Sequence, residues 1–162
     1  MNKYTRLFCT AVVVLILDQI TKLWIINTVE PGTYIDPPPI PVIPGFYYIV
    51  HIYNTGGAWG SFAGGSFWLG LLGLAVVIGI FIFRKKLGLE QVSMQYSIGL
   101  LVGGVLGNVI DRFSYGHVID FIDIHLPGYR WPAFNIADAA IFSGIAIYVI
   151  VILLDSSKKE MK

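Results

Sequence analysis

Four long apolar segments restrict what this chain of 162 residues can fold into. They cover about residues 7–28, 67–83, 92–110 and 136–154. A helix that crosses a membrane needs about 20 mostly apolar residues, and each segment is close to that length. Hydrophobic residues make up 56% of the sequence and charged residues 13%, whereas a soluble domain carries about 25% charged residues. We therefore predict a mainly α-helical membrane protein with four transmembrane helices in a single domain, residues 1–162.

The basic residues predict a direction across the membrane. They gather at the two termini and between the second and third segments, at Lys3, Arg6, Arg84, Lys85, Lys86, Lys158, Lys159 and Lys162. Residues 27–66 contain neither Lys nor Arg. Because basic loops stay on the cytoplasmic side of a bilayer, we expect both termini in the cytoplasm and residues 29–66 and 111–135 outside.

The first outer region, about residues 29–66, has the composition of a small β-sheet. Residues 46–53 read Phe-Tyr-Tyr-Ile-Val-His-Ile-Tyr, and such β-branched and aromatic residues favour strands. Tyrosine also favours the membrane–water interface. We expect an extracytoplasmic β-sheet, or cradle, between the first and second helices, resting on the outer surface of the membrane.

The polar residues of the apolar segments share one depth. Asp18 and Lys22 lie in the outer half of the first segment, and their spacing of four places them on one helical face, where they can pair. The outer ends of the third and fourth segments and the loop between them carry the others, which are Asn108, Asp111, Arg112, Asp120, Asn135 and Asp138. This one-sided cluster is typical of a site that acts at the outer membrane surface.

Asp120 and Asp138 are the candidates for chemistry. A carboxylate in lipid costs roughly 2.5–3.5 kcal/mol on insertion scales, so its presence needs a reason. Two carboxylates that share a proton can activate water against a peptide bond, which indicates a membrane aspartyl protease. The helix dipole favours the anion of Asp138, so we predict that Asp138 is the general base and Asp120 the initial acid.

Structural interpretations stand beside this one. Asn135 and Asp138 fit the N-cap and N3 positions of the fourth helix, an Asn version of the capping box. In the structural interpretation of Asp18 and Lys22, the two residues simply neutralise each other. Three glycines at four-residue spacing in the third segment, Gly99, Gly103 and Gly107, predict close packing against a neighbouring helix.

The remaining acidic residues have simpler expectations. We expect Asp111 to form an ion pair at a helix end with Arg112 or Arg130, and Asp123 to be a solvated loop acid. No metal-binding spacing accompanies the three histidines, so we expect no metal. No basic arm suggests nucleic acid.

A small proton or solute transporter that uses intramembrane aspartates is the main alternative function. Such a pathway needs polar groups through the whole thickness of the bilayer, and these residues gather on one side. A non-catalytic scaffold bundle is a third possibility, which would tolerate Asp→Asn substitutions.

Five motifs occur in order along the chain. They are Asp18-Gln19-Ile20-Thr21-Lys22, Asn54-Thr55-Gly56-Gly57-Ala58-Trp59-Gly60, Gly107-Asn108-Val109-Ile110-Asp111-Arg112, Val118-Ile119-Asp120-Phe121 and Phe134-Asn135-Ile136-Ala137-Asp138. With them the chain resembles the bacterial lipoprotein signal peptidases, also called signal peptidase II, from the first helix to the last.

This resemblance implies an endopeptidase that removes the signal peptide from prolipoproteins carrying diacylglycerol on a cysteine, by cutting before that cysteine. It implies Asp120 and Asp138 as the catalytic pair. Supporting or substrate-binding positions are Asp18, Lys22, Asn54, Gly57, Asn108, Arg112, Asn135 and the non-catalytic Asp111.

The resemblance also sets expectations about surroundings. We expect a monomer in the bacterial cytoplasmic (inner) membrane, with its site near the extracytoplasmic face and membrane lipid around it. We expect no cofactor, and inhibition by globomycin, a cyclic peptide that mimics substrate.

Overall fold

The computed structural model describes residues 4–34, 38–57 and 61–160, with side chains up to Ser156. Lys3, Lys162 and the motif residues Ala58, Trp59 and Gly60 lie outside the described residues. Along the chain the elements are α1 (Thr5–Thr28), β1 (Ile40–Ile43), β2 (Tyr47–Asn54), α2 (Ser66–Ile82), α3 (Val92–Tyr115), β3 (Val118–Leu126), β4 (Tyr129–Arg130) and α4 (Ile136–Glu160).

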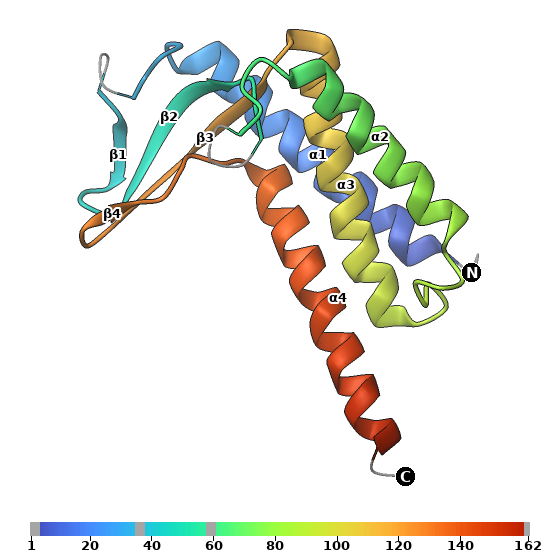
Figure 1. The fold of residues 1–162 in the computed structure, drawn as a ribbon. Helices are drawn as coiled ribbons and strands as arrows, with labels where there is room; N and C mark the ends of the chain where they lie inside the picture. Colours follow the sequence, from blue (N-terminus) through green and yellow to red (C-terminus); the bar gives the residue numbers. More distant parts are fainter. Residues whose placement is uncertain (1–3, 35–37, 58–60, 161–162) are drawn as a thin grey trace.

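All four apolar segments form helices, as predicted. Figure 1 shows the helices as a bundle, with the sheet projecting sideways from the end where α1 and α3 finish and α4 begins. The two chain ends and the α2–α3 connection lie toward the other end. Within the described residues, α1, α3 and α4 are long and apolar enough to cross a membrane, while α2 is apolar but has 17 residues.

α3 is the central helix, since α1, α2 and α4 all pack against it. Its glycines allow this. A Cβ on Gly103 would lie 2.6 Å from the Ala11 carbonyl oxygen of α1, and a Cβ on Gly104 would collide with the Ala137 carbonyl oxygen of α4. The predicted close packing of the glycine stripe is therefore confirmed, and it brings three backbones together without large side chains between them.

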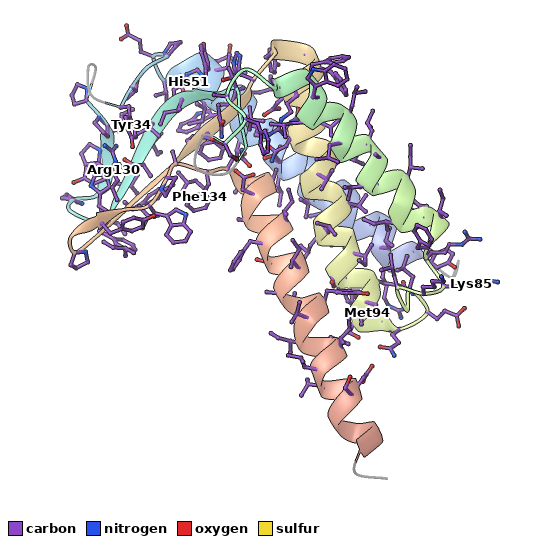
Figure 2. All side chains as sticks on the ribbon, viewed as in Figure 1. Tyr34, His51, Lys85, Met94, Arg130 and Phe134 are labelled. Atoms are coloured by element: carbon purple, nitrogen blue, oxygen red, sulfur yellow. The ribbon has the colours of Figure 1, made fainter. Side chains whose placement is uncertain are left out.

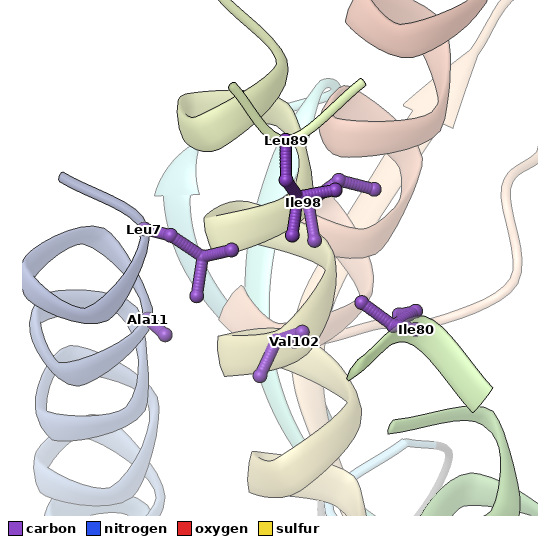
Figure 3. Packing of buried hydrophobic residues seen from close by; sticks show 6 residues of the cluster. All are labelled: Leu7, Ala11, Ile80, Leu89, Ile98 and Val102. Carbon is purple, nitrogen blue, oxygen red and sulfur yellow. The ribbon is translucent and has the colours of Figure 1, made fainter. Parts of the chain in front are cut away.

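A compact apolar cluster closes the bundle at the end away from the sheet. It joins α1, α2, α3 and the α2–α3 connection through Leu7, Ala11, Ile80, Leu89, Ile98 and Val102 (Figure 3). The outward faces of α1 and α4 stay exposed and apolar, with Phe8, Trp24 and Phe142 each about half exposed or more. Such faces suit contact with lipid.

The sheet is antiparallel, in the order β1-β2-β3-β4. Only β1 and β2 come from the region between the first two helices. The expectation that the sheet belongs to residues 29–66 was therefore incomplete, because β3 occupies a segment expected to be a loop. The sequence did not predict this strand because it contains Asp120 and Asp123, and aspartate is rare in strands. Here Asp120 lies opposite Ile52 of β2 in the ladder.

Asp123 is completely buried, so the expectation of a solvated loop acid was wrong. Arg130 donates from Nε to its Oδ1 over 3.0 Å, and His125 Nε2 lies 2.9 Å from its Oδ2. The Arg130 guanidinium also lies 3.6 Å from the centre of the ring of Tyr34, in the turn before β1, and Figure 2 shows both residues on the side of the molecule that carries the sheet. The carboxylate is buried because a cation accompanies it.

The glycine contacts predict unequal effects of alanine. Gly103→Ala should destabilise the protein by about 1–3 kcal/mol, because the added methyl group meets backbone that cannot move aside. Gly79→Ala is the matched control, since nothing lies within 4 Å of the position that its Cβ would take. Thermal unfolding in detergent measures the difference, and equal midpoints for the two variants would contradict this account of the packing.

Candidate active site

A buried ammonium group lies between α1 and α3, near the C-terminal ends of both helices. Lys22 is 1% exposed, and its Nζ contacts Asp18 Oδ2 at 2.8 Å and Asp111 Oδ2 at 2.7 Å. Its third contact is Asn108 Oδ1, at 3.0 Å. The predicted Asp18–Lys22 pair is confirmed. Asp111 pairs with Lys22 rather than with Arg112 or Arg130, because its side chain turns inward from α3 toward α1.

Asp18 extends this cluster to the fourth helix. Its Oδ1 accepts a hydrogen bond of 2.9 Å from the Ala137 backbone N–H, in the first turn of α4. Gly107 allows the approach, since a Cβ there would collide with the Asp18 carboxylate. The cluster therefore links α1, α3 and α4 at one depth. This is the one-sided arrangement that the sequence predicts.

Asn135 and Asp138 form the predicted capping box. The Asp138 N–H donates to Asn135 Oδ1 at 2.9 Å, and the Asn135 N–H donates to Asp138 Oδ2 at 3.3 Å. These bonds satisfy backbone donors at the start of α4. The cap also determines where the rest of the Asn135 side chain points.

Two asparagine amides hold Asp120. Asn135 Nδ2 donates to its Oδ1 over 2.7 Å, and Asn54 Nδ2 donates to its Oδ2 over 2.9 Å. The other end of each amide accepts a backbone N–H, from Asp138 and from Gly56 respectively. Because a backbone N–H can only donate, each amide must turn its NH2 group toward Asp120.

A third amide holds Asp138. Asn108 Nδ2 donates to Asp138 Oδ1 over 2.8 Å, so both oxygens of this carboxylate accept a hydrogen bond. Asn108 Oδ1 also accepts from Asn135 Nδ2 at 3.3 Å. Asn108 and Asn135 thus form a bridge between the two candidate carboxyl groups.

The environment of Asp120 favours its protonated form. Burial raises its pKa to about 7, and the charge of Asp138 adds to the rise. The hydrogen bonds from Asn54 and Asn135 and the charge of Lys22 oppose it. Asp120 therefore holds its proton up to near-neutral pH, while Asp138 is partly exposed at a helix N-terminus that favours an anion. The protonated form of Asp120 is thus suited to act as the acid.

Arg112 lies beside the two aspartates. Its guanidinium donates to the Gly56 carbonyl at 3.1 Å and to the Asn108 carbonyl at 3.3 Å, and the charges of Asp138 and Asp120 act on it. Its Nε is buried and has no hydrogen-bond partner among the described residues. A buried donor of this kind is suited to a ligand oxygen.

An open groove of about 260 Å³ leads to this group of residues. Asn108, Arg112 and Asp138 line its polar end. Its apolar walls come from α2, α3 and α4, and they are formed by Leu69, Leu72, Gly73, Val76, Val105, Val109 and Ile141. The groove therefore joins an apolar surface between helices to Asp138, one of the two candidate carboxyl groups.

The structure brings together nearly all the predicted site residues. Gly57 differs, since it lies in the loop after β2 and its N–H donates to the Ser61 carbonyl. Gln19 was missed. Its amide donates to Asp111 Oδ1 at 3.0 Å and to Asp18 Oδ2 at 3.2 Å. Its place beside Asp18, as a polar residue in an apolar helix, was a usable signal.

Comparison with known proteins identifies the family. The family model described as "Signal peptidase (SPase) II" matches residues 10–154. The chain belongs to the signal peptidase II family. A lipoprotein signal peptidase of Bacillus velezensis is 37% identical over 94% of this chain and 97% of its own length. One of Synechocystis is 42% identical over 84% of this chain and 80% of its own.

Solved structures agree with this membership. A bacterial membrane enzyme determined by the in meso method at 2.3 Å resolution superposes with a TM-score of 0.86. It is 37% identical in sequence, over 96% of this chain and 92% of its own. Signal peptidase II is a protease family. The grouped polar residues are therefore candidates for a peptidase site. Within the described part of the chain, no three His, Cys, Asp or Glu side chains form a possible metal site.

The two roles of Asn135 can be separated. Asn135→Ser keeps a capping oxygen but removes the amide donor to Asp120, so the pKa of Asp120 should rise above about 7. Asn135→Ala should show the same rise and also lose about 0.5–2 kcal/mol of stability with the cap. Infrared titration of the protonated carboxyl band measures the pKa, with Asp120→Asn assigning the band. An unchanged pKa in Asn135→Ser would contradict the role of the amide.

Proposed function

We propose that this signal peptidase II family member is a membrane aspartyl endopeptidase that removes the signal peptide from diacylglyceryl-modified prolipoproteins, by cutting before the lipidated cysteine. The observation that carries the proposal is the pair Asp120 and Asp138. Three oriented asparagine amides hold their carboxyl groups, and Asp138 lines the polar end of a groove between helices.

The proposed reaction uses Asp138 as the base and Asp120 as the acid. Asp138 takes a proton from water while the water oxygen bonds to the scissile carbonyl carbon, and Asp120 gives its proton to the carbonyl oxygen. The C–N bond of the resulting diol then breaks. The amine leaves with the proton from Asp138, and Asp120 regains its proton from the new carboxyl group. The pKa of about 7 at Asp120 supports its assignment as the acid.

Arg112 and the groove suit a lipidated substrate. The Arg112 guanidinium lines the groove beside Asp138, and its Nε, which has no partner among the described residues, is the donor proposed for an ester or peptide carbonyl oxygen. The apolar walls formed by α2, α3 and α4 are suited to an acyl chain or to the apolar part of a signal peptide. Globomycin, as a substrate-like peptide, is expected to occupy the same groove and to inhibit.

We further propose four membrane spans, with both termini in the cytoplasm of a bacterial cell and the site near the outer face of its cytoplasmic membrane. The basic residues Arg84, Lys85 and Lys86 lie at the bundle end opposite the sheet, which supports this direction (Figures 1 and 2). α2 would be the fourth span, about 25 Å long at 1.5 Å per residue. We expect one chain to form the complete enzyme, as a single domain.

The sheet is proposed to rest on the membrane surface as a cradle. Its far part carries exposed apolar and aromatic side chains, which are Ile40, Val42, Ile43, Phe46, Leu126, Tyr129 and Trp131. Aromatic residues favour the membrane–water interface, so contact with lipid headgroups accounts for their exposure.

The aspartate pair can be tested by amide substitution. Asp120→Asn and Asp138→Asn should each fold and each lower the rate of processing of a lipidated precursor by about 100-fold or more, since each removes a proton-transfer group. Asp111→Asn should retain more activity, because Asp111 contacts Lys22 and not the pair. Normal processing by either of the first two variants would exclude the proposal. A transporter would instead show solute or proton flux in proteoliposomes without lipoprotein.

The groove predicts a matched pair of tryptophan variants. Ile141→Trp fills the groove from α4 and should raise KM for a lipidated substrate about tenfold or more, while Ile145→Trp, one turn further and on the exposed face, should change it little. Initial rates in mixed micelles over a range of substrate concentrations measure both. Equal KM values for the two variants would show that substrate does not use this groove.

A further inference from the structure

Lys22 has a role that charge neutralisation alone does not explain. Its ammonium has three N–H donors, and all three reach acceptors on Asp18, Asp111 and Asn108. The two buried carboxylates use two of these donors. The contact to the neutral Asn108 amide therefore calls for a separate explanation, and Asn108 is the residue that holds Asp138.

The ammonium decides which way the Asn108 amide faces. The oxygen and nitrogen of an amide have nearly the same shape, so its direction is set by its partners. Lys22 can only donate, so the Asn108 oxygen must face Lys22 and the NH2 group must face Asp138. In the opposite orientation, the amide oxygen would face the Asp138 carboxylate and the amide N–H would face an ammonium.

Among the described residues, the only other hydrogen bond to the side-chain oxygen of Asn108, Oδ1, is the 3.3 Å contact from Asn135. It is longer than the 3.0 Å contact from Lys22, and it carries no full charge. Lys22 is thus the stronger of the two orienting groups.

We infer that Lys22 is a positioning residue of the aspartate pair, which fixes the Asn108 amide so that its NH2 group holds and orients the Asp138 carboxylate. The inference rests on the proposed peptidase function. Asp18 and Asp111 keep the ammonium charged and in place, and the Ala137 N–H ties Asp18 to the turn of α4 that carries Asp138.

The first test is a mutant cycle with Lys22→Met and Asn108→Ala, assayed on a lipidated peptide at saturating and limiting concentrations. Lys22→Met should lower kcat about 10- to 100-fold with KM changed less than about threefold, since substrate does not contact Lys22. The double variant should be no slower than Asn108→Ala alone, because both changes remove the same oriented amide. Independent, multiplying losses would overturn the inference.

The pH dependence gives a readout that mere destabilisation would not move. The charges of Asp138 on α4, Lys22 on α1 and Arg112 on α3 act on Asp120. The cation at Lys22 lowers the pKa of Asp120, so Lys22→Met should raise that pKa. Because Asp120 must be protonated to act as the acid, the fall of kcat at high pH should move to higher pH. If kcat of Lys22→Met fell at the same high pH as in the wild-type protein, the positioning role of Lys22 would be contradicted. A kcat equal to that of the wild-type protein would contradict it as well.

Two further variants separate this role from folding. Lys22→Met/Asp111→Asn leaves one buried carboxylate in place of two carboxylates and one cation, so the net charge of the cluster is unchanged. It should fold even if Lys22→Met does not, and it should be slower than Asp111→Asn alone. Equal rates for these two variants would overturn the inference.

Asp123→Asn is the control, since it breaks an ion pair of another fully buried carboxylate, on β3 and β4 of the sheet. It should lower the unfolding midpoint without moving the pH profile. A similar pH shift in Asp123→Asn would show that any loss of stability moves the pH profile. That result would overturn the inference. If the wild-type protein does not cleave the lipidated peptide, the proposed function fails, whereas cleavage by wild type with an unaffected Lys22→Met rejects only the role of Lys22.

Discussion

The contact of one buried ammonium with two carboxylates organises the end of the helix bundle where α1 and α3 finish and α4 begins. Lys22, Asp18 and Asp111 come from α1 and α3, and Asp18 reaches the backbone of α4. Burying such charges is costly, and removing one partner leaves the others uncompensated. The three helices are therefore held together at the level of the first turn of α4, which contains Asp138. The glycines of α3 make the approach possible, since side chains there would separate the backbones.

The candidate carboxyl groups gain their environment from parts of the chain that are far apart. Asp120 belongs to a strand that pairs with β2, and Asp138 belongs to the first turn of α4. Each asparagine that contacts them is turned by a group that can only donate, and so each presents its NH2 group to a carboxylate. The capping box of α4 is one of these orienting devices. The structural and the chemical interpretations of Asn135 and Asp138 are thus compatible, since one set of contacts serves both.

The placement of the polar residues agrees with a reaction at a membrane surface. The groove leads from apolar helix walls to Asp138 and Arg112, so an apolar ligand and a polar reaction centre can meet there. The sheet projects from the same end and exposes aromatic side chains. The groove and the sheet come from different segments of the chain. Folding brings them to the same end of the molecule.

The sequence by itself determined the helical membrane class, the one-sided depth of the polar residues and the candidate pair. These follow from apolar length and from residue type, which are local properties. It did not reveal β3, because the partners that make Asp120 and Asp123 acceptable in a strand lie elsewhere in the chain. Nor did it indicate that Asp111 pairs with Lys22, or which way any asparagine amide faces. Only the tertiary structure decided these points, since burial and hydrogen-bond direction depend on which groups meet after folding.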